Sequence, residues 1–176
     1  MVDEAGFREL MTRVCSPVTV ITTLTPQGLP YGTTVGAFMS LSLRPPMVAA
    51  ALDRGSGLLA HARASGRIGV NVLRCDAGHI AAGFARTGAD KFDGVDWILD
   101  HGLPRLRPVC AWLACEIASI VPGGDHLILL SQVTSGQMTD NLPLTYLRRS
   151  FGTHLPIQQR VSLLSLQMSA HGDAVL

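Results

Sequence analysis

The pattern of hydrophobic and polar positions predicts about six or seven strands with three short helices inserted among them. In the first helix, Phe7, Leu10, Met11 and Val14 recur at the i, i+3, i+4 and i+7 spacing, and Asp3 stands where it can cap the helix. A proline soon afterwards forbids continuation. The chain therefore opens with an amphipathic helix that has one apolar face.

Two further helices are predicted where a capping residue precedes a short apolar spacing. Ser56 is placed to cap the second helix and Gly66 to end it. Asp76 is placed to cap the third, in which Ile80 and Phe84 stand four positions apart on one face.

Runs of β-branched and alternating apolar residues, separated by Pro and Gly turns, predict the strands. Residues 88–97 between them are irregular and polar. Because the helices do not alternate regularly with the strands, the pattern argues against a doubly wound parallel sheet and favours an antiparallel barrel with helices packed around it. The predicted strands cover residues 18–23, 31–35, 47–52, 67–73, 111–121, 126–135 and 144–147.

The amino-acid composition indicates that part of the surface is covered by another chain or by a ligand. Apolar residues make up 47% of the 176-residue chain and charged residues only 15%. A single domain this poor in charge would expose large apolar patches, which usually mark an interface or a ligand groove. We therefore expect a homo-oligomer, most simply a two-fold dimer.

Charge and hydropathy exclude several classes of function. The net charge of +1 and the lack of a dense Lys/Arg cluster argue against nucleic-acid binding. No run of about 18 apolar residues could span a membrane. The first residues, Met1 to Glu4, are acidic where a signal peptide is basic, so we expect a cytoplasmic protein.

The four cysteines are scattered without CxxC spacing. In a cytoplasmic protein we expect them to be reduced and mostly buried, and we expect no metal site. Neither a GxSxG elbow nor an HExxH motif is present, so hydrolysis has little support. A reaction whose chemistry is carried by a cofactor fits this lack of acid–base groups.

Four segments could bind such a ligand. Residues 32–42 combine small residues, hydroxyls and one aromatic after a strand, which suits a flat heterocycle, although they also fit an ordinary strand. Residues 54–58 form a glycine-containing helix start that could bind phosphate or be a plain capped helix. The histidine of residues 123–126 could contact a ligand or bond its aspartate neighbour, and residues 89–92 place a cation beside an aromatic in a loop.

Taken together and in this order, eight segments resemble the flavin reductase-like family across roughly residues 5–152. That family includes the small reductase components of two-component flavin monooxygenases. The segments that carry the resemblance are residues 7–11, 17–23, 32–42, 44–46, 69–73, 84–86, 90–92 and the Gly-Gly-Asp-His sequence at 123–126.

The resemblance implies a mainly β fold with short helices, namely an antiparallel, Greek-key-like, FMN-binding split β-barrel that works as a homodimer. It implies hydride transfer from NADH or NADPH to FMN or FAD, with the reduced flavin passed to a separate monooxygenase. The most similar branch serves antibiotic and polyketide biosynthesis. The domain would cover residues 1–152, and residues 153–176 would be an extension of unassigned role. The alternative is a flavin- or haem-binding redox enzyme or sensor on the same barrel, with a tightly held cofactor.

The resemblance also assigns site residues by position, and it implies no obligatory acid–base residue. This chain departs from the family pattern at Gly36 and Ala37, where hydroxyl side chains are usual, and at Arg149, where glycine is usual. The residues implied are Thr33, Thr34, Val35, Gly36, Ala37, Phe38 and Ser40 along the isoalloxazine and ribityl chain; Arg54, Ser56 and Gly57 near the phosphate; Asn71 and Leu73 packed near the flavin; Lys91 and Phe92 at its phosphate end; and His126, Tyr146 and Arg148 facing the nicotinamide nucleotide.

Overall fold

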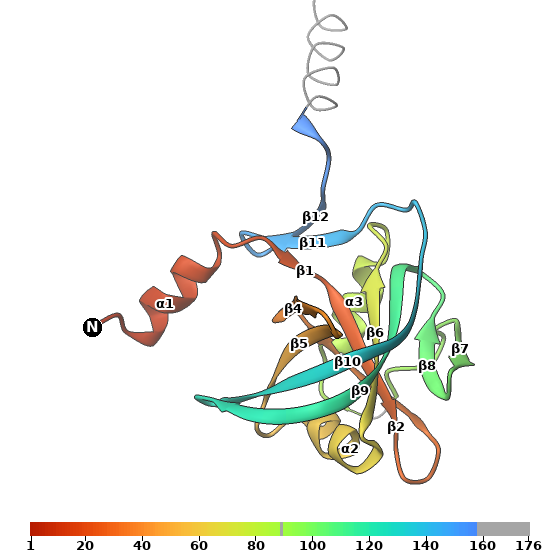
Figure 1. The fold of residues 1–176 in the computed structure, drawn as a ribbon. Coiled ribbons are helices and arrows are strands. Elements are labelled where there is room, and N and C mark those ends of the chain that lie inside the picture. Colours follow the sequence, from red (N-terminus) through yellow and green to blue (C-terminus); the bar gives the residue numbers. More distant parts are fainter. Residues whose placement is uncertain (89, 158–176) are drawn as a thin grey trace, which may run out of the picture.

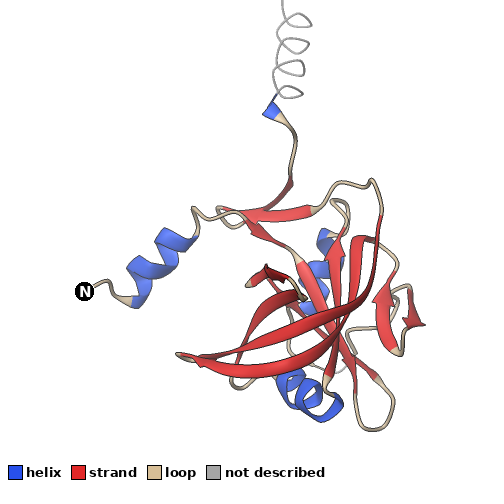
Figure 2. Cartoon of the chain, viewed as in Figure 1, coloured by secondary structure: helices blue, strands red, loops and turns tan. Residues whose placement is uncertain are grey.

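Twelve strands and three helices make up the part of the chain that the structure, a computed structural model, describes: residues 1–88 and 90–157 (Figure 1, Figure 2). The helices are α1 (Glu4–Met11), α2 (Gly57–Ser65) and α3 (Gly78–Phe84). The strands are β1 (Ser16–Pro17), β2 (Thr19–Leu24), β3 (Pro30–Val35), β4 (Phe38–Leu43), β5 (Pro46–Asp53), β6 (Arg67–Leu73), β7 (Trp97–Asp100), β8 (Leu103–Leu106), β9 (Val109–Gly123), β10 (His126–Met138), β11 (Leu144–Leu147) and β12 (Ser150–Thr153).

Seven of these strands form one antiparallel sheet in the order β3-β2-β6-β9-β10-β5-β4. The long β9–β10 hairpin lies at its middle and turns at Gly124 and Asp125. Two smaller sheets flank it, β1-β11-β12 and the β7–β8 hairpin. The prediction of a mainly β, antiparallel fold with three short helices is confirmed.

The two edges of the large sheet are joined by a link of only two residues. Strand β3 ends at Val35 and β4 begins at Phe38, so Gly36 and Ala37 lead from one edge strand directly to the other. The backbone N–H of Ala51 on β5 donates to the carbonyl of Ala37 (2.9 Å). A link this short requires the sheet to curl until its edges meet. Among the described residues no hydrogen-bonded ladder joins β3 to β4, so the sheet closes at this point and is open beyond it.

Two apolar clusters fill the curled sheet, and each is covered by one helix. Helix α2 buries Leu58, Leu59 and Ala62 in one cluster, and α3 buries Phe84 in the other, beside Trp112 of β9. Burying a large apolar side chain contributes about 1.5–3 kcal/mol. The predicted apolar faces of both helices are confirmed, and so is Gly66, whose φ of 69° ends α2.

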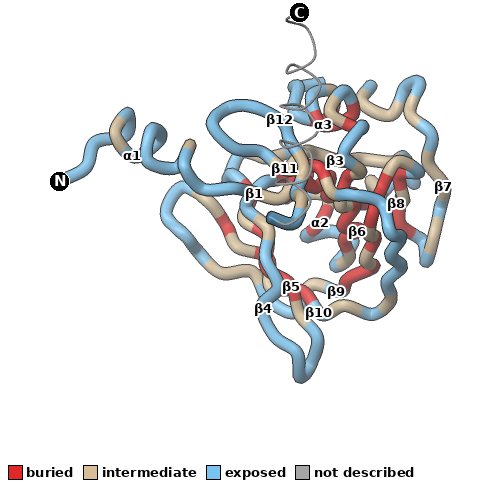
Figure 3. Tube along the Cα trace, turned by 90° about the horizontal axis from the view of Figure 1, so that it is seen from above, coloured by how far each residue is buried: buried red, intermediate tan, exposed pale blue. Residues whose placement is uncertain are grey.

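Helix α1 differs from the other two because none of its residues is buried. It projects away from the sheets in Figure 1, and it is pale blue along most of its length in Figure 3. Asp3 caps it as predicted, accepting a hydrogen bond from Gly6 N–H (2.8 Å). Of the predicted apolar face, Phe7, Leu10 and Met11 lie on the helix and Val14 lies beyond its end, and none of these side chains is buried within the described chain.

The structure corrects several predicted details. Asp76 does not cap α3: its carboxylate pairs with Arg74 (2.6 Å), and Ala77 occupies the N-cap position. Ser56 is the N-cap residue of α2, but its hydroxyl makes no capping hydrogen bond. Strands β1, β4, β7, β8 and β12 were not predicted, and most of the predicted extension 153–176 lies outside the described residues.

The cysteines are less buried than expected. Cys110 and Cys115 are buried, whereas Cys15 and Cys75 are exposed. Burial raises the pKa of Cys115 to about 12, so this thiol stays neutral and unreactive. Within the described residues, no helix is long and apolar enough to cross a membrane.

Candidate functional site

A pocket of about 270 Å³ lies where the two edges of the sheet meet, and we name it the seam pocket. Residues from β3, the two-residue link, β5, the start of α2 and the start of β10 contribute to it. Seven of the residues implied by the family resemblance are among them. The seam pocket is lined by Thr33, Thr34, Val35, Gly36, Ala37, Ala51, Leu52, Asp53, Ser56 and His126.

Antiparallel pairing of β5 with β10 brings Ser56 and His126 to this pocket, whereas the other two phosphate-binding candidates, Arg54 and Gly57, do not line it. His126 is the register partner of Asp53, and Arg54 N–H donates to the Asp125 carbonyl (3.2 Å). The Arg54 Nε donates to the carbonyl of Gly124 (3.0 Å), which holds this side chain against the β9–β10 turn. The start of α2 follows at once, so its first turn faces the same pocket as the histidine.

Sequence reasoning missed three residues of this pocket, Ala51, Leu52 and Asp53, of which Asp53 alone has a charged side chain. Its carboxylate accepts the N–H of Gly55 (2.6 Å), and its carbonyl accepts the N–H of Ser56 (3.0 Å). This is the local bonding of an aspartate that starts a turn. An aspartate two residues before a glycine at the end of a predicted strand was the available signal. It shapes the loop that presents the α2 N-terminus.

The two threonines of β3 use their hydroxyl protons to hold α3. Thr33 donates to the carbonyl of Phe84 (3.3 Å) and Thr34 to that of Ala81 (2.7 Å). Since β3 is an edge strand, half of its backbone N–H and C=O groups point away from β2. The strand therefore offers a ligand its edge backbone, in addition to the remaining lone pairs of the hydroxyls.

The link residues leave room beside this edge. A Cβ atom at Gly36 would lie 3.7 Å from Ser16 Cβ and 3.8 Å from the Pro17 carbonyl oxygen, which are ordinary contacts. A side chain would therefore fit at this position. No steric contact requires a glycine at position 36, and the lack of a side chain there widens the pocket.

A second, apolar pocket of about 280 Å³ adjoins the first, because Thr34 and Gly36 line both. The rings of Tyr146 and Phe151 close its outer side, with 5.4 Å between their centroids. The remaining lining residues belong to β1 and α3 or directly follow them: Ser16, Pro17, Val18, Ala81, Ala82 and Ala85. Tyr146 thus lines the pocket that adjoins the seam pocket, and it does not line the seam pocket itself.

His126 combines both of the roles weighed for it. Its Nδ1 lies 2.8 Å from an Asp125 carboxylate oxygen, and its ring also lines the seam pocket. The hydrogen bond from His126 holds the pKa of Asp125 below its ordinary value. The carboxylate therefore orients the ring at the mouth of the pocket.

Lys91 and Phe92 lie away from the seam pocket. Lys91 lines a separate pocket of about 400 Å³ beside α3. Its Nζ donates to the carbonyls of Phe84 (3.1 Å) and Gly32 (3.4 Å), and burial lowers its pKa. Phe92 packs edge-on against Phe84, with 4.9 Å between centroids. A phosphate role for this lysine stays a prediction.

Asn71 and Leu73 are fully buried and do not line the seam pocket. The Asn71 amide donates to the Val20 carbonyl (3.1 Å) and the Thr22 hydroxyl (3.2 Å), and it accepts the N–H of Leu106 (2.8 Å). These bonds tie β2, β6 and β8 together behind the pocket.

The other implied residues do not line the seam pocket. Phe38 is half-buried in the apolar cluster under α2, Ser40 is exposed on β4, and Gly57 packs against the Tyr31 hydroxyl. Arg148 lies at the far side of Tyr146. Among residues 1–88 and 90–157, no three His, Cys, Asp or Glu side chains gather in a way that could hold a metal ion.

Comparison with known proteins identifies a family for almost the whole described chain. The family model of the flavin reductase like domain matches residues 11–154. The reductase component of 4-nitrophenol 4-monooxygenase/4-nitrocatechol 2-monooxygenase from Rhodococcus opacus is 37% identical over 155 residues, which are 88% of this chain and 83% of that protein. A flavin reductase (NADH) from Kitasatospora aureofaciens is 33% identical and covers 98% of this chain and 92% of its own length.

A solved structure agrees with the fold. The NADH:FAD oxidoreductase of Streptomyces globisporus, in complex with NAD and FAD fragments, superimposes with a TM-score of 0.83 and 28% identity. The alignment covers 88% of this chain and 94% of that one.

Replacing Asn71 by leucine tests whether this residue is structural. We expect Asn71→Leu to lower the free energy of unfolding by about 2–4 kcal/mol, because the buried Leu106 N–H and Val20 carbonyl lose their partner. Asn141→Ala, in an exposed loop, is the control and should change it by less than about 0.5 kcal/mol. Both are measured by urea denaturation. Unchanged stability together with weakened flavin binding would instead make Asn71 a flavin contact.

Proposed function

The chain belongs to the flavin reductase-like family, and we propose that it is an NAD(P)H-dependent flavin reductase that passes reduced flavin to a separate monooxygenase. The observation that carries the proposal is the seam pocket, which unites an edge strand, a small-residue link, a helix N-terminus and a histidine. The partner oxygenase is supported by the relative from Rhodococcus opacus, which is itself a reductase component.

The residues present fit a flavin. The backbone edge of β3 can pair with the polar rim of a heterocycle, and Gly36 and Ala37 let a flat ring approach closely. Ser56, whose hydroxyl makes no capping bond, stands with the α2 N-terminus where it can meet a phosphate. When bound, the flavin accepts a hydride and carries it away in reduced form.

The protein's contribution is positioning. His126, oriented by Asp125, is placed to contact a nicotinamide nucleotide at the mouth of the pocket. Holding two rings in stacking distance accounts for catalysis of direct hydride transfer without an acid or base. Gly36, Ala37 and Asp53 are exposed, so the pocket opens to solvent and a product can leave by diffusion.

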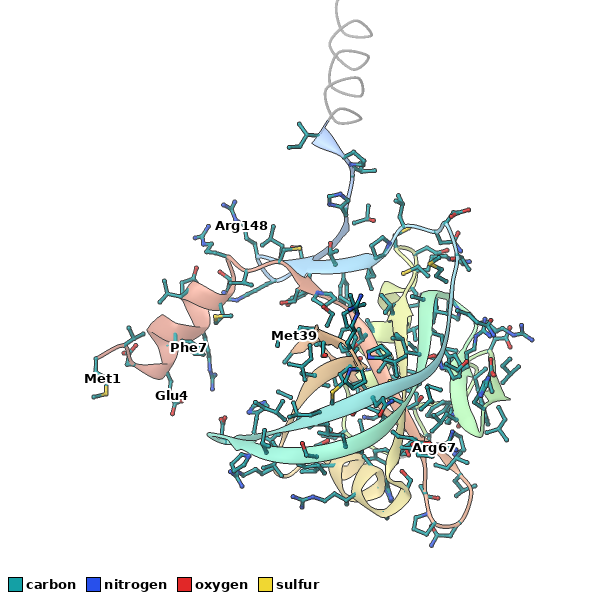
Figure 4. The ribbon with its side chains drawn as sticks, viewed as in Figure 1. Met1, Glu4, Phe7, Met39, Arg67 and Arg148 are labelled. Atoms are coloured by element: carbon teal, nitrogen blue, oxygen red, sulfur yellow. The ribbon has the colours of Figure 1, made fainter. Side chains whose placement is uncertain are left out.

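We further propose that a second copy of the chain packs against α1 and β4 beside the seam pocket and completes the split barrel. Phe7 on α1 is 57% exposed and Leu43 on β4 is 80% exposed. Figure 4 labels Phe7 on the projecting helix and Met39 on the side of the sheets toward it. Exposed apolar side chains on two elements that face the same side favour an interface with another chain. They comprise Phe7, Leu10, Met11, Val14, Met39, Leu41 and Leu43.

Oxidation of NADH and NADPH at 340 nm, with and without free FMN or FAD, tests the reductase function. We expect rapid oxidation that requires added flavin, and the same assay ranks the two flavins. Purified protein that retains a yellow or haem colour and shows no flavin-dependent oxidation would instead indicate an enzyme or sensor with a tightly held cofactor.

Two substitutions test the division of the seam pocket. Ser56→Asp should weaken flavin binding by at least roughly tenfold, because a carboxylate repels phosphate at close range. His126→Ala should raise the KM for the nicotinamide nucleotide more than that for flavin. Steady-state kinetics and fluorescence titration of flavin provide the readouts. The reverse pattern would exchange the two assignments, and no effect of Ser56→Asp would remove α2 from the site.

The interface is tested by Leu43→Asp. We expect the unmodified protein to have twice the chain mass of 18.7 kDa in analytical ultracentrifugation and the variant to shift toward monomer, since an interface core disfavours a charge. Leu99→Asp, at a position 60% exposed on β7, is the matched control and should leave the mass unchanged. A monomeric unmodified protein would contradict the proposal.

A further inference from the structure

The turn between β11 and β12 carries two arginines in a backbone conformation that disfavours them. Leu147 pairs with Ser150, so Arg148 and Arg149 alone form the turn, with φ of 50° and 60°. Two positive φ values in a two-residue hairpin turn favour Asn-Gly, and a long side chain is strained at both positions. Such strain persists at sites where the side chains have a function.

This turn docks onto the end of α1. The N–H of Arg148 donates to the carbonyl of Thr12 (2.9 Å), and Arg149 Nη2 lies 3.1 Å from a carboxylate oxygen of Glu9 (Figure 4 labels Arg148 at this corner). The contact brings Arg8 and Arg13 of the N-terminal segment to the same place. Arg148 and Arg149 line two pockets where the helix meets the hairpin, and Arg13 lines one of these pockets and Arg8 the other.

The acidic groups here do not neutralise these cations. Glu4 pairs with Arg8 (3.7 Å), and Glu9 is shared between Arg13 (3.6 Å) and Arg149. Within the described residues no carboxylate pairs with Arg148. Four arginines against two glutamates leave two positive charges in excess, although the whole chain carries only +1. All these ion pairs are exposed, and exposed pairs are weak enough for an anion to compete with them.

We name the region lined by Arg8, Arg13, Arg148 and Arg149 the arginine corner. It contains two pockets that connect to the candidate site. A pocket of about 340 Å³ runs from Arg8 and Thr12 to the arginine turn, and it shares Ser16 and Tyr146 with the apolar pocket. A smaller pocket of about 120 Å³ adds Arg13. The seam pocket, the apolar pocket and this arginine corner therefore follow one another in series.

We propose that the Arg148–Arg149 turn, with Arg8 and Arg13, binds the 2′-phosphate of NADPH and so selects the phosphorylated nicotinamide nucleotide over NADH. The proposal rests on the proposed function. A flavin that binds with its phosphate toward Ser56 occupies the seam pocket, and a nicotinamide nucleotide that contacts His126 can extend from there through the apolar pocket to the arginines. A phosphomonoester carries nearly two negative charges and accepts bidentate hydrogen bonds from guanidinium groups, which matches the local excess.

A binding measurement tests the site without any catalysis. Adenosine 2′,5′-bisphosphate and 5′-AMP differ by the 2′-phosphate alone, and their dissociation constants are compared by calorimetry. We expect the bisphosphate to bind at least about tenfold more tightly, as for charge-assisted hydrogen bonds. The double variant Arg148→Asn/Arg149→Gly should abolish the difference. Arg63→Ala, an exposed arginine on α2, is the control and should preserve it.

The double variant also separates a binding role from a structural one. It installs the residues that this turn type favours, so thermal melting should show a fold at least as stable as that of the unmodified protein. We expect the KM for NADPH to rise about tenfold or more and by a larger factor than the KM for NADH, while the KM values for FMN and FAD stay unchanged.

Three results would overturn the proposal. They are equal affinity for the two adenosine ligands, a preference of the unmodified enzyme for NADH, and a change in the KM for FAD alone, which would assign the corner to the diphosphate of that flavin. If neither nucleotide is oxidised at all, the proposed function fails, and the calorimetry still decides whether a phosphate binds at the corner.

Discussion

The two-residue link between β3 and β4 is the constraint on which the rest of the molecule depends. Gly36 and Ala37 connect strands that stand at opposite edges of a seven-stranded sheet. Because a span of two residues is short, the sheet must curl until its edges meet. The curl encloses the apolar clusters, leaves the backbone edge of β3 beside a gap, and brings the β5–α2 junction and the start of β10 to that gap. The candidate site follows from the topology.

The sequence predicted the elements whose side chains alternate between core and solvent. Strands 67–73 and 144–147 have the predicted bounds, and the long β9–β10 hairpin differs only at its ends. Strand β4 escaped prediction because five of its six residues are exposed, so no alternation marks it. The short strands β7 and β8 follow a polar segment that carries no periodicity. Asp76 has the composition of a cap, but Arg74 is a charged partner two residues away and takes its carboxylate.

The candidate site was predictable where it is local and unpredictable where it depends on packing. Thr33 to Ala37 are consecutive, so they reach the seam pocket together. Lys91 and Asn71 do not line the seam pocket. Their side chains instead donate hydrogen bonds to backbone carbonyls, Lys91 to that of Phe84 and Asn71 to that of Val20. The arginine corner needs α1 and β11–β12 to meet, and these segments lie about 140 positions apart in the chain. Helix α1 leaves its apolar residues exposed and the Arg148–Arg149 turn has two positive φ values, which is why we propose a binding role for each.

Hydrogen–deuterium exchange with and without free flavin tests most directly that the seam pocket is the flavin site. The account predicts that saturating FAD or FMN slows amide exchange in residues 33–37 and 51–57 and around His126, while the β7–β8 hairpin is unaffected. Protection confined to α3 and the pocket around Lys91 would contradict it and would place the flavin on the other side of that helix.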